Sequence, residues 1–344
     1  MAEIEALGRT VTADWTSAVA DRVAAAWGLP PGTARWWRSS AAHVFVLPGS
    51  DGKRYLRFVP ATSRSEASVA AVARLMAALA DDGAAVVRPV PAASGALVAT
   101  VGTDLGPMHA VVVEAAPGEA IDADDLTDGT ARAWGEALAT LHRDAAGHGE
   151  GLPEAFGELD EVAARHADDE VLVHAAATLA ARLSELPRDS AGFGVVHGDP
   201  ELDNLAWEGG RATAYDFDEA ARSWYAADVA FALRDLTGPD GRIEPAFQGR
   251  AAAFVAGYRA VRPFTAAEER RLPLFAGVHA VGTVVRIGRA LDRPAAPDDA
   301  GEAGAAGGLA DLRLHLADLA RAQRDLAVAV AARLPASPTG VTTG

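Results

Sequence analysis

The stretch VVHGDPELDN (residues 195–204) concentrates oxygen-bearing side chains directly after two valines. The valines favour a short buried strand. A Gly-Gly pair then predicts a tight turn, and ATAYDFD (residues 212–218) returns as a second strand. We therefore expect a hairpin that places Asp199, Asn204 and Asp216 close together.

The chemistry of these side chains indicates a magnesium site. Carboxylate and amide oxygens suit Mg²⁺, which usually also binds substrate phosphates, and a carboxylate free of the metal can serve as a base. An isolated HGD would suggest only a turn with an aspartate cap. The asparagine five residues after Asp199 and the DFD twelve residues after Asn204 argue against that interpretation. The chain has no P-loop, Gly-x-Gly-x-x-Gly, His-Glu-x-x-His or Gly-x-Ser-x-Gly pattern.

Composition limits the classes of function. The chain has 344 residues, half of them hydrophobic, which suggests two lobes. Its net charge of −16 argues against a basic, nucleic-acid-binding surface. The charge is compatible with a cationic substrate, although solubility is the simpler explanation. The absence of cysteine excludes disulfides, thiolate zinc sites and a cysteine nucleophile. No secretory signal and no uncharged apolar run of about 18 residues is visible, so we expect a cytoplasmic protein without a membrane partner.

Hydrophobic periodicity divides the chain into two parts. In residues 1–116 we expect a helix over 12–29, strands at 42–47 and 54–59, and a helix over 65–82 that is followed by further strands. Residues 117–344 are mostly helical, with two short strand-like pieces around the acidic cluster. The pattern predicts an α+β fold, in which a small antiparallel-sheet lobe with one main helix precedes a larger helical lobe.

The motifs HGDPELDN and YDFDEA resemble those of the aminoglycoside phosphotransferase and choline kinase group, protein-kinase-like enzymes with His-Gly-Asp-x-x-x-x-Asn followed by a DFD-type motif. HAVVVEAAPGE resembles the hinge segment of that group, and the resemblance extends over residues 34–236. It implies a bilobal protein-kinase-like fold. It also implies transfer of the γ-phosphate of ATP, or of another NTP, to a hydroxyl of a small molecule with the help of Mg²⁺.

The resemblance assigns roles by position in the C-terminal lobe. Asp199 would be the catalytic base that orients the substrate hydroxyl, while Asn204 and Asp216 would bind Mg²⁺. His197 would hold the catalytic loop. Asp218, the second acid of YDFD, would assist a second metal or the fold of the loop. Asp228, the acid of YAADVA, would brace the catalytic loop from a helix.

The N-terminal lobe requires a cation on a central strand to hold the nucleotide phosphates. The candidates are Lys53, Arg54 and Arg57, and we expect Arg57 because it lies in mid-strand between Leu56 and Phe58. Its planar guanidinium suits bidentate phosphate contact, whereas Lys53 follows a glycine at a hairpin tip.

Other cofactor contacts are expected from three segments. Glu66 is the only acid early in the predicted helix and is a candidate partner for the cation, although its register could also place it near the helix start. The segment RWWRSSAAHV has no glycine, so Ser39 and Ser40 would approach the phosphates. Adenine would pair with backbone groups of the hinge, at Val113, Glu114 and Ala116.

The sequence does not identify the acceptor substrate. An amino sugar or aminoglycoside-like compound, another antibiotic and an amino-alcohol, homoserine-like or nucleoside-type metabolite are all admissible, and the oligomeric state is not determined. Two other classes of protein remain as alternatives. One is a pseudokinase that binds a nucleotide or a partner without turnover, and the other is a helical interaction protein with accidental motifs. The full set of Asp199, Asn204 and Asp216 favours the enzyme.

Overall fold

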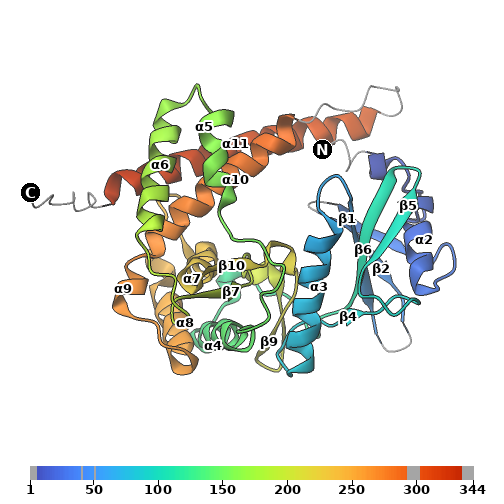
Figure 1. Cartoon of the computed structure of the whole chain (residues 1–344), viewed down its shortest axis with the longest axis horizontal. Helices are drawn as coiled ribbons and strands as arrows, with labels where there is room; N and C mark the ends of the chain where they lie inside the picture. Colours follow the sequence, from blue (N-terminus) through green and yellow to red (C-terminus); the bar gives the residue numbers. More distant parts are fainter. Residues whose placement is uncertain (1–5, 40–41, 50–51, 293–302, 335–344) are drawn as a thin grey trace, which may run out of the picture.

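The computed structural model describes residues 6–39, 42–49, 52–292 and 303–334. They form two lobes (Figure 1): a sheet-containing lobe, blue to cyan, and a helical lobe, green to red. Strand β6 of the first lobe ends at Glu114, and the first long helix of the second begins at Asp128. The expected boundary after residue 116 falls in the connection between them and stays a prediction.

The N-terminal lobe is built on a six-stranded antiparallel sheet. The order is β1-β2-β3-β6-β4, and β5 also pairs with β6. The strands are β1 (Arg35–Ser39), β2 (His43–Leu47), β3 (Arg54–Pro60), β4 (Pro89–Val90), β5 (Ala99–Thr103) and β6 (Gly106–Glu114). Strand β3 is central, so a side chain in the middle of β3 is held on both sides.

Helix α3 (Glu66–Asp81) lies between this sheet and the helical lobe (Figure 1). The Ser65 hydroxyl caps it by accepting a hydrogen bond from the Ser68 N–H, at 3.2 Å. The buried face repeats at helical spacing with Val72, Leu75 and Leu79. Burial of each such side chain stabilises the folded state by about 1.5–3 kcal/mol. The helix therefore forms over almost the whole predicted range, 65–82.

The first predicted helix is shorter than expected. We predicted residues 12–29, but α2 spans Ala18–Ala24 and continues as a 3₁₀ turn to Trp27. Trp15 has a φ of 62°, which no α-helix accommodates, and its ring stacks on Trp36 with 5.6 Å between centroids. This tertiary contact takes Trp15 out of the helix, and the Ser17 side chain becomes the N-cap.

The C-terminal lobe is mainly helical. Its helices are α4 (Asp128–Asp144), α5 (Val162–Arg165), α6 (Glu170–Ser184), α7 (Tyr225–Ala232), α8 (Gln248–Val261), α9 (Ala266–Glu269), α10 (Leu272–Asp292) and α11 (Ala303–Arg333). Helices α4 and α8 pack closely because Gly135 of α4 faces the other backbone, where a Cβ atom would lie 2.0 Å from the Phe254 carbonyl oxygen. The ring of Trp134 packs edge-on against Phe254 beside this contact.

Helix α10 is, by length and composition, apolar enough to cross a membrane. In the structure it packs against α6, α7 and α11, and its buried residues include Phe275, Val281 and Val285. The helix therefore serves as a core element of the C-terminal lobe.

The strands around the acidic cluster pair differently from the prediction. Strand β7 (Phe193–Val196), which precedes His197, pairs with β10 (Ala221–Trp224). The hairpin is formed instead by β8 (Leu205–Glu208) and β9 (Arg211–Ala214). Both turn glycines have positive φ, 57° at Gly209 and 80° at Gly210, as a two-residue hairpin turn requires. The hairpin begins after Asn204 and ends before Tyr215, and the Tyr215 N–H donates to the Asn204 carbonyl at 3.0 Å.

Candidate active site

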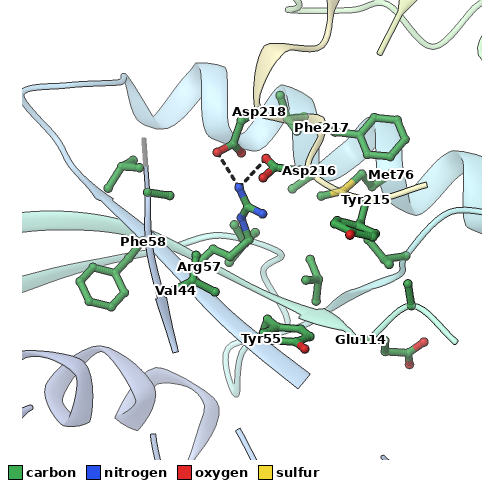
Figure 2. Close-up of a pocket in the computed structure, with 18 of the residues that line it drawn as sticks. Val44, Tyr55, Arg57, Phe58, Met76, Glu114, Tyr215, Asp216, Phe217 and Asp218 are labelled. Carbon is green, nitrogen blue, oxygen red and sulfur yellow. Dashed lines mark hydrogen bonds and ion pairs between the residues drawn. The ribbon is translucent and has the colours of Figure 1, made fainter. Parts of the chain in front are cut away.

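A cavity of about 260 Å³ lies in the cleft between the lobes (Figure 2). Its walls combine apolar side chains of the sheet and of α3 with polar groups of the C-terminal lobe. The lining residues that matter here are Val44, Tyr55, Arg57, Val72, Met76, Val111, Val113, Glu114, Ala116, Ala206, Tyr215, Asp216 and Asp218. A narrow apolar slot that ends in charged groups fits a flat ring joined to a polyphosphate.

The predicted hinge borders this cavity with Val113, Glu114 and Ala116. The Glu114 N–H donates to the Arg88 carbonyl at 2.9 Å, so this donor is already used. Within the described part of the chain, the Ala116 N–H has no hydrogen-bond acceptor. It is therefore available to a ligand such as a purine edge.

Arg57 projects from the middle of β3 into the cavity (Figure 2). Its Nη2 lies 2.6 Å from Asp216 Oδ1 and 2.7 Å from Asp218 Oδ2, and only 14% of the side chain is exposed. Burial alone would lower the pKa of Arg57, but the two carboxylates outweigh it and raise the pKa above its ordinary value. Lys53 is exposed just before β3 and does not line the cavity.

Glu66 is not the partner of Arg57. It is exposed as the first residue of α3, whereas the described ion pairs of Arg57 are those with Asp216 and Asp218. Helix α3 presents apolar side chains such as Met76 to the cavity instead. The carboxylates that neutralise the strand cation therefore come from the other lobe.

Ser39 also departs from its expected position. Its hydroxyl accepts from Trp36 Nε1 at 3.1 Å and contacts His43 Nδ1 at 3.1 Å, and the residue does not line the cavity. Ser40 lies outside the described residues. The neighbouring Arg38 reaches the site instead, with Nη2 3.2 Å from Asp216 Oδ2. Arg38 was not among the predicted residues, although its position directly before the serine pair was the available signal.

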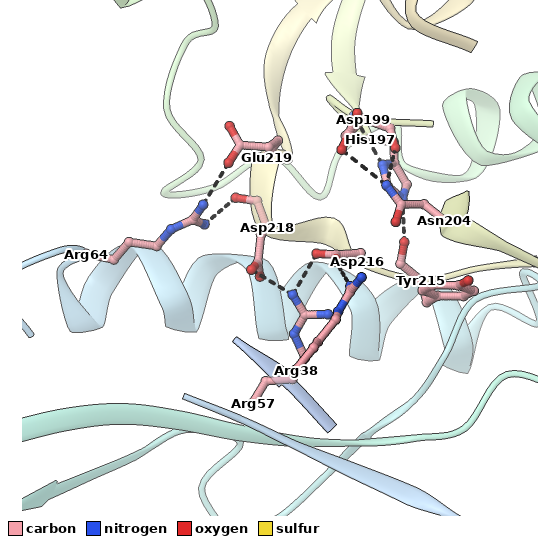
Figure 3. Close-up of polar contacts among 10 residues, drawn as sticks. All are labelled: Arg38, Arg57, Arg64, His197, Asp199, Asn204, Tyr215, Asp216, Asp218 and Glu219. Carbon is pink, nitrogen blue, oxygen red and sulfur yellow. Dashed lines mark hydrogen bonds and ion pairs between the residues drawn. The ribbon is translucent and has the colours of Figure 1, made fainter. Parts of the chain in front are cut away.

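A third arginine of the N-terminal lobe also crosses the cleft (Figure 3). Arg64, just before α3, donates to the backbone oxygen of Asp218 and to Glu219 Oε1, the latter at 2.8 Å. Arg38 and Arg57 contact the same acidic segment. Three guanidinium groups thus converge on the DFDE stretch, and the sequence pattern had singled out only Arg57.

Asp199 and Asn204 lie in direct contact (Figure 3). The Asn204 side-chain Nδ2 donates to the Asp199 carbonyl at 2.9 Å and to its Oδ2 at 3.2 Å. Asp216 has a left-handed backbone, with φ 63° and ψ 58°, a conformation that aspartate tolerates better than most residues. Figure 3 shows that this turn directs the Asp216 carboxylate toward Arg57 and Arg38.

A buried network supports the loop that carries Asp199. Asp228 of α7 is completely buried and accepts the N–H groups of His197 at 2.7 Å and Gly198 at 2.9 Å. His197 Nε2 in turn lies 3.0 Å from the Tyr215 carbonyl. These contacts place His197 and Asp228 beside the loop, and Asp218 contacts Arg57. The supporting roles of the three residues stay predictions.

His142 of α4 joins this network and was not anticipated. Its Nε2 lies 3.0 Å from Asp228 Oδ2, and its Nδ1 lies 2.7 Å from the Tyr258 hydroxyl. Burial lowers the pKa of His142, despite the opposing effect of Asp228. A neutral ring that donates from Nε2 and accepts at Nδ1 satisfies both partners.

A second cavity, of about 1,340 Å³, is bordered by Asp199. Eight carboxylates and four guanidinium groups line it, together with aromatic and small apolar side chains. The residues used below are Arg64, Asp199, Asp218, Phe231, Arg234, His279 and Arg286. Asp218 and Arg64 line both cavities, so the two cavities meet at the acidic cluster.

The residues present fit a magnesium ion that also binds phosphate. Asn204 and Asp216 offer the oxygen donors that Mg²⁺ prefers. In the described part of the chain no group of three or more His, Cys, Asp or Glu side chains is arranged to hold a metal. That agrees with a Mg²⁺ whose shell is completed by phosphates and water. Arg57 and Arg38 supply positive charge to the Asp216 carboxylate in this structure.

Comparison with known proteins bears on this geometry. Among curated proteins, the chain is 26% identical over 166 residues to the amicoumacin kinase of Bacillus subtilis (strain 168), covering 46% of this chain and 49% of the relative. It is 34% identical over 217 residues to a homoserine kinase of Gluconacetobacter diazotrophicus, covering 59% of this chain and 64% of the relative. The matched region thus spans about half to two thirds of these relatives.

Solved structures show the same fold. The structure of amicoumacin kinase hAmiN in complex with AMP-PNP, Ca²⁺ and Ami superposes with a TM-score of 0.69 at 19% identity, covering 87% of this chain and 92% of the other. A microcompartment-associated aminopropanol kinase gives a TM-score of 0.65 at 21% identity, covering 90% and 95%. The expected α+β, bilobal, protein-kinase-like fold is confirmed. The family model of the phosphotransferase enzyme family (APH) matches residues 31–264, about two thirds of the chain, and we conclude that the protein belongs to that family.

Proposed function

We propose that this protein is an ATP-dependent phosphotransferase that transfers the γ-phosphate to a hydroxyl of a small molecule. One observation carries the proposal. Asp216 borders the interlobe cavity and Asp199 borders the larger one, while Asp218 and Arg64 line both. A phosphate held in the first cavity would face a hydroxyl held in the second across this shared acidic cluster.

The residues support the chemistry of such a transfer. The hydroxyl oxygen of the acceptor forms a bond to the γ-phosphorus while the bond to the bridging oxygen of ADP breaks, and Asp199 takes the hydroxyl proton. Arg57, placed by β3 beside Asp216, neutralises phosphate charge. Asn204 and Asp216 would hold Mg²⁺, which supplies charge neutralisation at the phosphates.

The larger cavity supports an acceptor that carries an amine. Carboxylates outnumber guanidinium groups along its wall, and aromatic side chains such as Phe231 provide apolar contact area. An amino sugar, an aminoglycoside-like or other antibiotic, and an amino-alcohol metabolite fit this description. Relatives named as amicoumacin, homoserine and aminopropanol kinases are compatible with that range.

A phosphate-transfer screen tests the proposal. The protein is incubated with Mg²⁺ and γ-labelled ATP, and label is followed into pools of amino sugars, amino alcohols, hydroxy amino acids and nucleosides. Asp199→Asn is the control, since loss of a positioned base costs on the order of 10²–10⁴-fold in rate while nucleotide binding remains. Transfer by the variant within about threefold of wild type would show that Asp199 is not the base.

The same screen distinguishes an active phosphotransferase from a pseudokinase that binds nucleotide without turnover. That protein would bind ATP with Mg²⁺, measured by calorimetry, but would label no acceptor and would hydrolyse no ATP. An interaction protein with accidental motifs would bind no nucleotide at all.

A further inference from the structure

Arg234 lies beside the candidate base. It belongs to the 3₁₀ turn η6 (Leu233–Leu236), directly after the helix that carries Asp228. Its Nη2 is 2.9 Å from Asp199 Oδ1 and also bonds Glu201 Oε2. Its Nη1 is 3.1 Å from His279 Nε2, on α10. Arg234 therefore joins the base to a neighbouring loop residue and to the wall of the larger cavity.

The environment of Arg234 keeps it charged and in place. Although burial opposes its charge, Asp199 and Glu201 raise the pKa of Arg234. Burial, reinforced by Arg234 and Arg286, holds the pKa of His279 well below its usual range, so this ring can accept the Nη1 hydrogen bond. The guanidinium is thus held by three acceptors, two at Nη2 and one at Nη1.

The same short segment also holds the backbone of the loop. Asp235 Oδ2 accepts the Leu202 N–H at 2.9 Å, and Asp228 accepts the N–H groups just before Asp199. The loop is fixed on both sides of the base by backbone contacts. The side chain of Asp199 is the part that these backbone contacts leave free to rotate.

We propose that Arg234 is the positioning residue of the base, an inference that rests on the proposed function. Arg234 holds Asp199 Oδ1, and Asn204 Nδ2 lies 3.2 Å from Oδ2. Partners at both oxygens fix rotation about the Cβ–Cγ bond, which a single partner would not. A carboxylate that is held in one orientation is already placed to accept the proton of the acceptor hydroxyl. A misplacement of about 1 Å can lower the rate on the order of 100-fold.

Steady-state kinetics distinguish positioning from other roles. With wild-type acceptor activity from the pooled screen, or ATP hydrolysis with water as acceptor, we expect Arg234→Met to lower kcat about tenfold or more. We expect the KM for ATP to stay within about twofold, since Arg234 does not line the nucleotide cavity. Arg234→Lys should recover part of kcat by restoring a donor and a charge. Arg324→Met is the matched control: Arg324 is similarly enclosed and binds Asp169 through two hydrogen bonds, and neither residue lines the two cavities.

A double-mutant comparison shows whether Arg234 acts through Asp199. In the Asp199→Asn background, Arg234→Met should change the residual rate by less than about twofold, because the carboxylate that it orients is gone. A full additional loss in that background would overturn the proposal. So would a raised acceptor KM at unchanged kcat, which would make Arg234 a substrate-binding residue.

Crystal structures test the role of Arg234 without any activity assay. Crystal structures of wild type and Arg234→Met should show the Asp199 carboxylate in one ordered orientation in the former and rotated or in several orientations in the latter. An unchanged Asp199 orientation in the variant would refute the inference even if no acceptor were found. Absence of any transfer or hydrolysis by wild type would instead count against the proposed function alone.

Discussion

Arg57 and Asp216 form an ion pair across the cleft, with Nη2 2.6 Å from Oδ1, although 159 positions separate them in the chain. In the proposed function, this is where a phosphate and its counter-ion would meet. The pair occupies a largely buried position, so its charges are weakly screened by solvent. Binding of a nucleotide must therefore exchange these contacts for others of similar strength.

The first prediction concerns the phosphate-holding cation. Arg57→Ala should raise the KM for ATP or lower kcat by about tenfold or more, because a buried guanidinium that faces the phosphates is lost. Lys53→Ala should stay within about twofold, since Lys53 is exposed outside the cavity. Steady-state kinetics with varied ATP measure both. The reverse pattern would place the phosphate anchor at the hairpin turn.

The second prediction concerns Arg38. Arg38→Ala should weaken binding of ATP with Mg²⁺ by about three- to tenfold, less than Arg57→Ala, because 52% of its side chain is exposed and its charge is better screened. Arg35→Ala is the control from the same strand, since Arg35 is exposed and bonds the Gly32 carbonyl away from the cavity. Calorimetric titration measures the affinities. Equal affinities of the two variants would exclude Arg38 from the phosphate site.

The third prediction concerns the metal ligand. Asp216→Ala should weaken nucleotide binding in the presence of Mg²⁺ but leave Mg²⁺-free binding much less affected, because the carboxylate acts through the ion. A Mg²⁺ titration of nucleotide affinity in wild type and variant provides the comparison. Identical Mg²⁺ responses would show that Asp216 is not a ligand. Asp218→Ala, tested in parallel, reports whether the second carboxylate shares that role.

The fourth prediction concerns pH and stability. His279 has a pKa lowered in the folded state, first by burial and then by Arg234 and Arg286. Below about pH 6.5, the ordinary histidine value, the unfolded chain binds a proton that the folded chain does not, so stability falls as pH falls. This group alone contributes a slope approaching about 1.4 kcal/mol per pH unit. His279→Gln, which keeps an acceptor for Arg234, should have a shallower decline between about pH 6.5 and 5 in denaturant unfolding. Parallel curves for the two proteins would contradict a neutral His279.

Local patterns predicted much of the fold. The spacing of Val72, Leu75 and Leu79, with Ser65 in front, predicts α3 because one helix face must be buried whatever it packs against. The Gly-Gly pair likewise predicts the β8–β9 turn, since both positions need positive φ. Where a tertiary contact competed, as at Trp15 stacked on Trp36, the predicted start of the helix was wrong.

The sequence by itself determined the chemical identity of the site. The spacing of Asp199, Asn204 and Asp216 follows from one loop and one hairpin within a short segment, so their proximity depends on local geometry. The mid-strand position of Arg57 was likewise predicted from its apolar neighbours Leu56 and Phe58. Both features depend on the geometry of short chain segments and not on how the two lobes pack together.

The partners of these residues were decided only by the tertiary structure. Arg57 pairs with Asp216 and Asp218, not with Glu66, and Asp199 pairs with Arg234. Which carboxylate a guanidinium reaches depends on how two lobes and several helices pack, and many arginines and acids in this chain have equivalent local surroundings. The Coulomb energy of an ion pair depends on the distance between the two charges in space and not on their separation in the sequence. The tertiary structure therefore selects the partner.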